Sequence, residues 1–316
     1  MKKPGILEAT ALLTTVFFFG AMEGGSFFAF LFLYLAPLPL FILGLKKDSP
    51  WCGIVGAVAA VSLFFITTPQ MSIMYLLAIA APTTFFCEKA ISRTGTSLQG
   101  WYSLSKLSLL LIVPPSFCFV LLTAYFWLYG QGLGFVFIEK TNEIFELYIS
   151  ALKGQGQNIN PSLSKQLDGV KKSFADTAPA LISIFWMSLI VLNGLIAQSI
   201  LKKSNRNQRP SFAIREVQIP RPFAVIFLSS LALASFSSGE LGYLVTNLTA
   251  ILAFPVMLTG LGVIHTVADK TNYSGSILLV LYLIITFSRW AAIFVVLVGI
   301  ADHFLKLRNK VQADKV

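Results

Sequence analysis

Long apolar blocks, almost free of charge, constrain this chain more than any other feature of its sequence. The clearest of them cover residues 27–45, 107–128, 181–201 and 277–300. About 20 apolar residues in a helix match the roughly 30 Å hydrocarbon core of a bilayer. Because that core holds no water, the backbone must pair its own polar groups, and a helix does so within one segment. The sequence therefore predicts an all-α fold, a polytopic transmembrane helical bundle.

The apolar pattern predicts about eight to nine hydrophobic helices and one extramembrane helical hairpin. About five of the helices lie in residues 1–129, the hairpin in 130–178 and about four helices in 179–316. We expect the helices at residues 6–22, 26–45, 51–68, 71–88, 107–129, 179–201, 222–238, 243–267 and 277–302.

The hairpin, residues 130–178, is the largest polar insertion between the predicted spans. Apolar residues at helical spacing form one face of its first helix: Phe137, Ile144, Tyr148 and Ala151. Glycine and amide residues at 154–158 end that helix, and Asn160 then caps a second helix with Pro161 at its first position. Such a hairpin serves either as a structural cap on the spans or as a lid or docking site for a protein partner.

Positive charge sets the expected orientation in the membrane. The chain carries 24 Lys and Arg against 14 Asp and Glu, a formal charge of +10. These cations cluster in loops beside the spans, where they determine topology and contact anionic lipid headgroups. We expect the most basic loop, 202–221, in the cytoplasm together with the N-terminus. The lipid bilayer, and not nucleic acid, is thus the expected partner, and loop 202–221 is a second candidate docking site for a protein.

The C-terminal tail is basic too, and its charge conflicts with the expected number of crossings. Placing the tail on the side of loop 202–221 requires an even number of crossings after residue 221. Three apolar segments follow that residue. Either the tail lies outside, or one segment does not cross fully. Segment 222–238, which is short and rich in serine, is the expected re-entrant one.

Arg289 lies near the middle of the last predicted span. A charge at the bilayer centre costs at least about 2.5–3.5 kcal/mol, so the side chain must face the bundle interior, water or an anionic partner. The functional interpretation is a contact to an anionic ligand. The alternative is a helix shifted in depth, with Arg289 reaching the interface beside Trp290.

Four residues of the preceding predicted helix complete the candidate ligand site. Glu240 and Tyr243 stand at its start, Asn247 follows one turn later, and His265 lies near its other end. Tyr243 and Asn247 are four residues apart and share a helix face. These residues either line a cavity for a small polar or anionic ligand or hold helices together by hydrogen bonds.

The sequence contains no recognisable catalytic or metal-binding arrangement. It has 2 His and lacks HExxH, GxSxG and P-loop motifs and clustered acidic residues. The three cysteines, Cys52, Cys87 and Cys118, belong to different helices without a CxxC pair, so we expect them to be small apolar fillers. We therefore predict no enzyme activity, no catalytic residue, no cofactor and no metal.

Several short motifs are spread over nearly the whole chain. The strongest are Glu-Leu-Gly-Tyr-Leu-Val-Thr-Asn-Leu at 240–248, Pro-Val-Met-Leu-Thr-Gly-Leu-Gly-Val-Ile-His at 255–265 and Gly-Ile-Ala-Asp-His-Phe-Leu-Lys-Leu-Arg at 299–308. Supporting motifs are Leu-Ala-Pro-Leu-Pro-Leu-Phe-Ile-Leu-Gly-Leu at 35–45, Trp-Tyr-Ser-Leu-Ser at 101–105, Asn193 and Arg-Pro-Ser at 209–211. Together they resemble the DUF2232 (YybS-like) family of bacterial membrane proteins, which implies a multi-pass protein of the inner, or plasma, membrane.

That family is grouped with the substrate-binding S components of energy-coupling-factor vitamin transporters. The resemblance therefore implies a compact helical bundle that holds a small ligand. The chain differs from S components in having more predicted spans and the hairpin 130–178. It also lacks their AxxxA docking motif in the first helix, where Leu13 follows Ala9 and Thr15 follows Ala11. The resemblance consequently does not extend to docking on a transporter module.

Two functions remain from the sequence. The first is binding or transport of a small molecule, in a cavity near the last helices where Asn247, His265 and Arg289 meet the ligand. The alternative is a membrane scaffold or assembly factor that acts through loop 202–221 and the hairpin 130–178.

Overall fold

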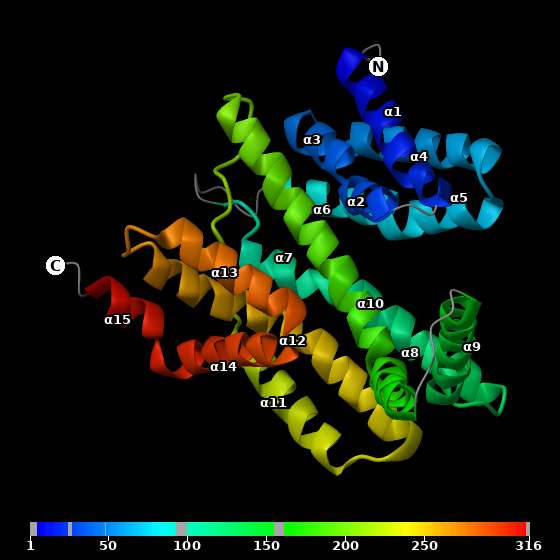
Figure 1. Cartoon of the computed structure of the whole chain (residues 1–316). Coiled ribbons are helices and arrows are strands. Elements are labelled where there is room, and N and C mark those ends of the chain that lie inside the picture. Colours follow the sequence, from blue (N-terminus) through cyan, green and yellow to red (C-terminus); the bar gives the residue numbers. More distant parts are fainter. Residues whose placement is uncertain (1–4, 25–26, 48, 93–99, 155–160, 314–316) are drawn as a thin grey trace. The chain divides into compact units, whose positions relative to one another are not determined.

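The computed structural model describes residues 5–24, 27–47, 49–92, 100–154 and 161–313 of the chain. Helices make up almost all of this part, which contains no β-strand (Figure 1). The predicted all-α class is thereby confirmed. Its physical cause is the apolar composition, because a helix pairs its backbone groups without help from water.

Six helical segments are long and apolar enough to cross a membrane: Phe28–Lys46, Ser49–Ile66, Pro69–Ile91, Leu104–Leu128, Lys165–Lys203 and Gly239–Ala268. The bent pair Ser274–Phe287 and Arg289–Leu305 makes a seventh if it is counted as one span. Two more apolar helices have 15 and 16 residues. They measure about 22–24 Å at 1.5 Å per residue, less than the roughly 30 Å hydrocarbon core. Several membrane spans are thus confirmed, whereas the predicted count of eight to nine is not.

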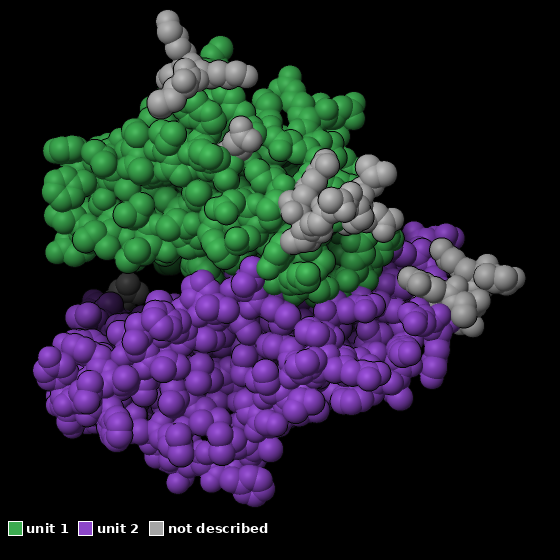
Figure 2. Space-filling view, turned by 180° about the vertical axis from the view of Figure 1, so that it is seen from behind, with its two compact units in different colours: residues 1–108, 185–217 green, residues 109–184, 218–316 purple. Residues whose placement is uncertain are grey.

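The chain forms two compact units, which Figure 2 colours separately. The first comprises residues 1–108 and 185–217, and the second comprises residues 109–184 and 218–316. Two helices, α7 (Leu104–Leu111) and α10 (Pro161–Lys203), contribute residues to both units. Each unit is therefore assembled from segments that lie far apart in the sequence.

The first unit contains the helices that follow the N-terminal apolar blocks. They are α1 (Ile6–Gly20), the short turn η1 (Ala21–Gly24), α2 (Phe27–Leu35), α3 (Leu38–Lys46), α4 (Ser49–Ile66), α5 (Pro69–Tyr75), the π-helical turn η2 (Leu76–Ala80) and α6 (Ala81–Ile91). Pro37 divides the predicted helix 26–45, because a proline lacks the N–H that would continue the hydrogen-bond ladder. Thr68 starts α5 by accepting a hydrogen bond of 3.3 Å from the Met71 N–H.

A second proline, Pro82, shows how this unit tolerates a break inside a span. Its missing N–H leaves the carbonyl of Ala78 without its usual helical partner. The indole Nε1–H of Trp186, on α10, donates a 2.7 Å hydrogen bond to that carbonyl. The side chain of one helix therefore pairs the backbone group that proline frees in another. Asn193 acts similarly, since its amide nitrogen donates a 2.7 Å bond to the Tyr34 carbonyl near the end of α2.

The second unit contains the remaining helices. They are α8 (Val113–Leu128), α9 (Leu133–Gly154), α11 (Arg221–Phe236), α12 (Gly239–Ala268), α13 (Ser274–Phe287), α14 (Arg289–Leu305) and α15 (Leu307–Ala313). α12 forms the core of this unit, because most of its residues from Phe254 to Val263 are buried. α9 corresponds to the first helix of the predicted hairpin.

The prediction of a separate hairpin within 130–178 is wrong in one respect. Its second helix does not end near residue 178 but continues as α10 through the predicted span 179–201. The predicted cap Asn160 lies outside the described residues, and Pro161 is the first described residue of α10. Pro179 lies inside this helix without ending it, because side chains of α12 form hydrogen bonds with the backbone groups of α10 around the proline.

α12 and α14 approach each other closely through two glycines. A β-carbon added to Gly260 would overlap the Val295 carbonyl, and one added to Gly299 would overlap the Val256 carbonyl. Hydrogen is thus the largest side chain that fits at either position. Small residues that allow close backbone contact are characteristic of helix pairs in membranes, where the hydrophobic effect does not drive association.

The last predicted helix, 277–302, is two helices and not one. Ser288 adopts an extended conformation between α13 and α14, and the two axes differ in direction by 118°. A turn of more than 90° sends α14 back toward the end of the unit at which α13 begins, and Figure 1 shows α14 returning beside α12. The segment expected not to cross fully, 222–238, corresponds to the helix α11, whose 16 residues make it shorter than the six candidate spans. With the chain turning back at Ser288, we predict that α11 and α12 are the two crossings between loop 202–221 and the basic tail.

This arrangement predicts the side on which the tail lies. We expect cysteines introduced by Arg206→Cys and Asn309→Cys to react with a membrane-impermeant maleimide from one side of sealed vesicles, and Ser238→Cys from the other. The background should carry Cys118→Ser, because Cys118 is the exposed native cysteine among the described residues. Labelling of residues 309 and 238 from the same side would contradict the two-crossing arrangement.

The close contact at Gly260 predicts that adding one methyl group there lowers the stability of the protein, whereas adding it at an open glycine does not. We expect Gly260→Ala to lower the free energy of unfolding by about 1–3 kcal/mol, the usual cost of overpacking a core. Gly275→Ala, in α13, is the matched control, because a β-carbon there meets no atom within 4 Å. Thermal unfolding of the purified variants in one detergent measures the difference. Equal melting temperatures for the two variants would show that the close contact is absent.

Candidate functional site

The start of α12 brings together three of the residues predicted to bind a ligand: Glu240, Tyr243 and Asn247. Asn247 is buried, and its side chain makes three hydrogen bonds. Its oxygen accepts one from the Ala180 N–H (3.1 Å), and its nitrogen donates to the carbonyls of Asp176 and Tyr243 (3.0 Å each). Asp176 and Ala180 are the carbonyl and N–H that would bond to each other in an unbroken helix. Asn247 therefore takes the place of that bond in α10.

Tyr243 completes the repair of α10 next to Pro179. Proline removes the N–H that would pair the Ala175 carbonyl. The Tyr243 hydroxyl donates a 3.2 Å hydrogen bond to that carbonyl. Tyr243 and Asn247 thus pair backbone groups that Pro179 leaves open, which explains how α10 continues through the proline.

Glu240 lies in the first turn of α12 and fastens α9 to it. The carboxylate accepts a 3.3 Å hydrogen bond from the Gly134 N–H, at the start of α9. A β-carbon at Gly132 would overlap this carboxylate, so a larger residue there would force the Glu240 side chain to move. A negative charge at a helix N-terminus is favourable because the first N–H groups point at it and carry the positive end of the helix dipole. Glu240, Tyr243 and Asn247 all bond to the backbone of α9 or α10.

His265 and Arg289 lie elsewhere in the second unit. His265 is about 27 Å further along α12 than Asn247, at 1.5 Å per residue. Its Nε2 lies 2.9 Å from the Tyr282 hydroxyl of α13. Arg289 is exposed at the first position of α14, with its guanidinium carbon 5.8 Å from the centroid of the Trp290 ring. The structure thus gathers Glu240, Tyr243 and Asn247, and it places His265 and Arg289 apart from them.

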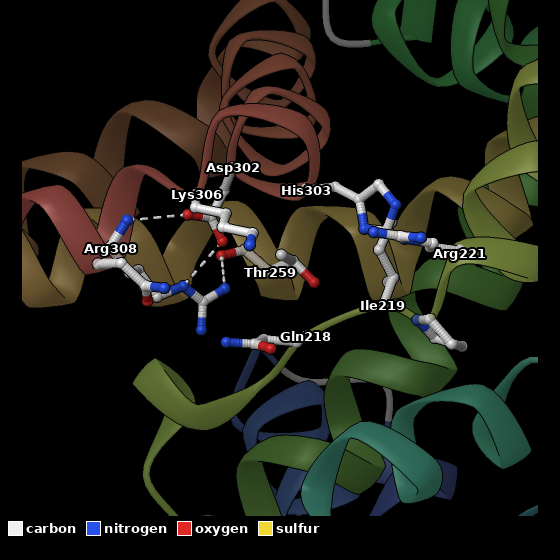
Figure 3. A pocket seen from close by; sticks show the side chains of 10 residues that line it. Gln218, Ile219, Arg221, Thr259, Asp302, His303, Lys306 and Arg308 are labelled. Carbon is white, nitrogen blue, oxygen red and sulfur yellow. Dashed lines mark hydrogen bonds and ion pairs between the residues drawn. The ribbon is translucent and has the colours of Figure 1, made fainter.

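A polar pocket lies between the start of α11, Thr259 of α12 and the end of α14 (Figure 3). Its volume is about 310 Å³, and none of the five predicted residues is among the described residues that line it. The lining residues come from the segment before α11, from α12, from the end of α14 and from α15: Gln218, Ile219, Pro220, Arg221, Thr259, Asp302, His303, Lys306, Arg308 and Asn309. The pocket therefore joins the end of the basic loop to the start of the basic tail.

A buried ion pair builds one wall of the pocket. Arg308 Nε lies 3.0 Å from Asp302 Oδ2, the Arg308 N–H donates a 3.0 Å bond to Oδ1, and Arg308 Nη2 donates a 3.1 Å bond to the Thr259 carbonyl. Both side chains are buried. Burial lowers the pKa of Arg308, and the neighbouring Asp302 carboxylate opposes that shift. Both oxygens of the one carboxylate in the pocket are thus already engaged.

Lys306 makes this wall possible by turning the chain. It adopts a left-handed conformation (φ 51°, ψ 47°) at the C-terminal cap of α14. The turn directs α15 so that Arg308 reaches back to Asp302, a contact that a continuous helix would not place at this spacing. Figure 3 shows Arg308 and Asp302 on one side of the pocket and His303 with Arg221 on the other. Arg221 and Lys306 are exposed, and among the described residues neither belongs to an ion pair.

The charge of the pocket favours an anion. Three cationic side chains (Arg221, Lys306 and Arg308) face a single carboxylate, a formal charge of +2 with His303 neutral. Because Arg308 neutralises Asp302, the attraction comes from Arg221 and Lys306. The sequence marks both residues as topology-determining cations, and it shows neither the left-handed turn at Lys306 nor the approach of α11 to α14. The sequence therefore does not predict the pairing of Asp302 with Arg308.

The basic loop 202–221, the other candidate site, is anchored to the first unit by Arg209. The guanidinium carbon lies 3.7 Å from the centroid of the Phe212 ring, and Nη1 donates to the carbonyls of Ala90 (2.5 Å) and Tyr102 (3.2 Å). Burial lowers the pKa of Arg209 to about 10. Gln208 adds bonds of 2.7 and 2.8 Å to the carbonyls of Lys46 and Lys47. The loop is held in place, with Lys202, Lys203 and Arg206 exposed on its surface.

Comparison with protein families gives a match that covers most of the chain. The model of a family described as "Predicted membrane protein (DUF2232)" matches residues 12–303. The chain belongs to this family. In this DUF2232 protein the matched region includes Arg221, Thr259, Asp302 and His303, whereas Lys306 and Arg308 lie beyond its end. Neither the curated proteins nor the solved structures contain a match.

The hydrogen bond from Tyr243 to the carbonyl that Pro179 leaves open predicts that mutations of these two residues have coupled effects on stability. We expect Tyr243→Phe to lower the free energy of unfolding by about 0.5–1.5 kcal/mol, the usual net value of one hydrogen bond. The loss should shrink when Pro179→Ala is also present, because alanine restores an N–H that pairs the Ala175 carbonyl. Thermal or denaturant unfolding of the four proteins of the cycle measures this coupling. Additive effects would show that Tyr243 does not act on the group that Pro179 frees.

Proposed function

We propose that this DUF2232 protein binds a small anionic molecule in the pocket between the start of α11 and the end of α14. The observation that supports this function is the pair of exposed cations, Arg221 and Lys306, beside a carboxylate that Arg308 already neutralises. An isolated patch of like charge is unfavourable unless water or an anion compensates it. An anionic ligand supplies that compensation.

The shape and chemistry of the pocket suit a compact ligand. Its volume of about 310 Å³ is at the small end of the range for ligand sites, roughly 300–1,000 Å³. Arg221 offers a planar pair of donors that matches a carboxylate or phosphate, and Lys306 offers a mobile point charge. The amides of Gln218 and Asn309 add donors and acceptors that orient such a ligand. Phosphate- and carboxylate-bearing molecules are the classes that this set of groups favours.

We propose binding alone for this pocket. Transport, kinship with S components, location in a bacterial inner membrane and a cytoplasmic N-terminus remain predictions from the sequence. The ligand-binding role of Arg289, Asn247, Glu240, Tyr243 and His265 also remains a prediction. For Glu240, Tyr243 and Asn247, the bonds to α9 and α10 support the alternative interpretation, in which they hold helices together.

The second candidate function is that of a scaffold, and the anchored loop 202–221 supports it. Arg209 and Gln208 fix the backbone of this loop, so that Lys202, Lys203 and Arg206 form a basic surface of defined position. An acidic protein partner is the chemistry that such a surface fits. Neutralising these three residues should abolish partner capture and leave anion binding at the pocket intact.

Anion binding can be measured with pyrophosphate as the probe. We expect pyrophosphate to raise the melting temperature of the full chain in a neutral detergent at constant ionic strength. Lys306→Asn should weaken binding at least tenfold, because a hydrogen bond to a charged group contributes about 1.5–3 kcal/mol. Asparagine is chosen because it tolerates the left-handed conformation of Lys306.

Lys310→Asn is the matched control, because Lys310 is an exposed lysine on α15 that does not line the pocket. It removes the same charge from the tail and should leave the affinity unchanged. An equal loss in both variants would indicate general attraction to the basic tail and not a site. Absence of binding at millimolar pyrophosphate would refute the proposed function.

A further inference from the structure

Two of the three cysteines meet inside the first unit. Cys52 lies near the start of α4 and Cys87 near the end of α6, and both side chains are buried. A β-carbon added to Gly44, in α3, would lie 2.6 Å from Cys87 Sγ and 3.2 Å from the Cys52 β-carbon. The two cysteines therefore pack around one glycine of a third helix, and their thiol groups interact directly.

Small residues bring α4 and α6 close enough for this contact. A β-carbon added to Gly56 would lie 2.9 Å from the β-carbon of Ala80, in the turn before α6. One added to Gly53 would lie 3.3 Å from Thr84 Cγ2. The contacts advance along α6 as they go back along α4, so the two helices are antiparallel. The cysteines form the next contact of this series, where small side chains already hold the backbones close together.

This contact approaches the geometry of a disulfide. The β-carbons of Cys52 and Cys87 lie 3.2 and 2.9 Å from the same point beside Gly44, and a disulfide brings two β-carbons to about 3.5–4.5 Å. We propose that Cys52 and Cys87 are a redox-active pair that closes to a disulfide between α4 and α6 when a peroxide oxidises it. This inference is independent of the proposed anion binding, because the pocket belongs to the second unit.

The pair lies near the ends of its two helices. At 1.5 Å per residue, Cys52 is about 5 Å from the start of α4 and Cys87 about 6 Å from the end of α6. Lys47 and Lys89 flank these ends, and basic residues mark the boundary between lipid and water. Thr84, beside Cys52, is only half-buried. Hydrogen peroxide is small and uncharged, so a local opening of these outer turns is sufficient to admit it.

The surroundings give the two cysteines different roles. The N-terminus of a helix favours a thiolate, and the Thr84 hydroxyl, 3.5 Å from the Cys52 sulfur, can donate a hydrogen bond to it. Cys87 lies near a helix C-terminus, which disfavours a negative charge. Cys52 is therefore the cysteine that attacks the peroxide.

The reaction proceeds in two balanced steps. The Cys52 sulfur takes one oxygen from hydrogen peroxide and becomes a sulfenic acid, while the other oxygen leaves as water with the proton that the thiol gave up. The Cys87 thiol then attacks the sulfenic sulfur, which forms the disulfide and releases a second water. Two molecules of a reducing thiol reverse the reaction by exchange and become a disulfide themselves.

Oxidation of the full chain carrying Cys118→Ser tests this inference. Cys118 is the exposed native cysteine among the described residues, so this background leaves the buried pair. The folded protein, in neutral detergent, is treated with hydrogen peroxide and unfolded, and the remaining free thiols are alkylated and counted by mass spectrometry. We expect both thiols to be lost together and to return on reduction with dithiothreitol. Two free thiols, in a sample whose added small thiol is fully oxidised, would overturn the inference.

Three variants in this background test the roles of the residues. Cys87→Ala should stop the reaction at the sulfenic acid of Cys52, which dimedone captures, and Cys52→Ala should react with peroxide at least tenfold more slowly. Thr84→Val keeps the shape of the side chain and should slow disulfide formation several-fold. Sulfenic acid on Cys87 and not on Cys52, or an unchanged rate with Thr84→Val, would contradict these roles. The melting temperature of each variant confirms that it is folded.

Discussion

Every backbone polar group in an apolar environment needs a partner, and this requirement organises the structure. Prolines inside the spans remove N–H groups and leave carbonyls open. Trp186 pairs the Ala78 carbonyl freed by Pro82, and Tyr243 pairs the Ala175 carbonyl freed by Pro179. The same bonds tie α10 to other helices of each unit. The carbonyls that the prolines leave open therefore serve as hydrogen-bond acceptors for side chains of neighbouring helices.

The same requirement decides what the polar residues within the helices do. The Asn247 amide forms hydrogen bonds with the backbone of α10, and the Glu240 carboxylate accepts one from the N–H of Gly134 at the start of α9. The basic side chains that we propose to bind a ligand lie instead at the end of the second unit. There the left-handed turn at Lys306 and the Asp302–Arg308 pair shape a basic pocket.

The topology that we predict after residue 221 depends on one break in the last apolar block. Charge alone indicates that the tail and loop 202–221 share a side, but it does not indicate which segment turns back. The extended Ser288 divides α13 from α14, so this segment reverses while α11 stays continuous. Close packing of Gly260 and Gly299 then holds α14 against α12. The resulting fold brings Arg221 and Lys306 to one pocket.

The sequence by itself determined the membrane class, the helical content, the family motifs and the positions of most helices, because apolar length and periodicity are local properties. It also placed Tyr243 and Asn247 on one helix face, because they are four residues apart. Only the tertiary structure decided their partners, the 118° turn at Ser288 and the Asp302–Arg308 pair. These features depend on which helices meet and on a single left-handed residue, and neither leaves a periodic signal in the chain.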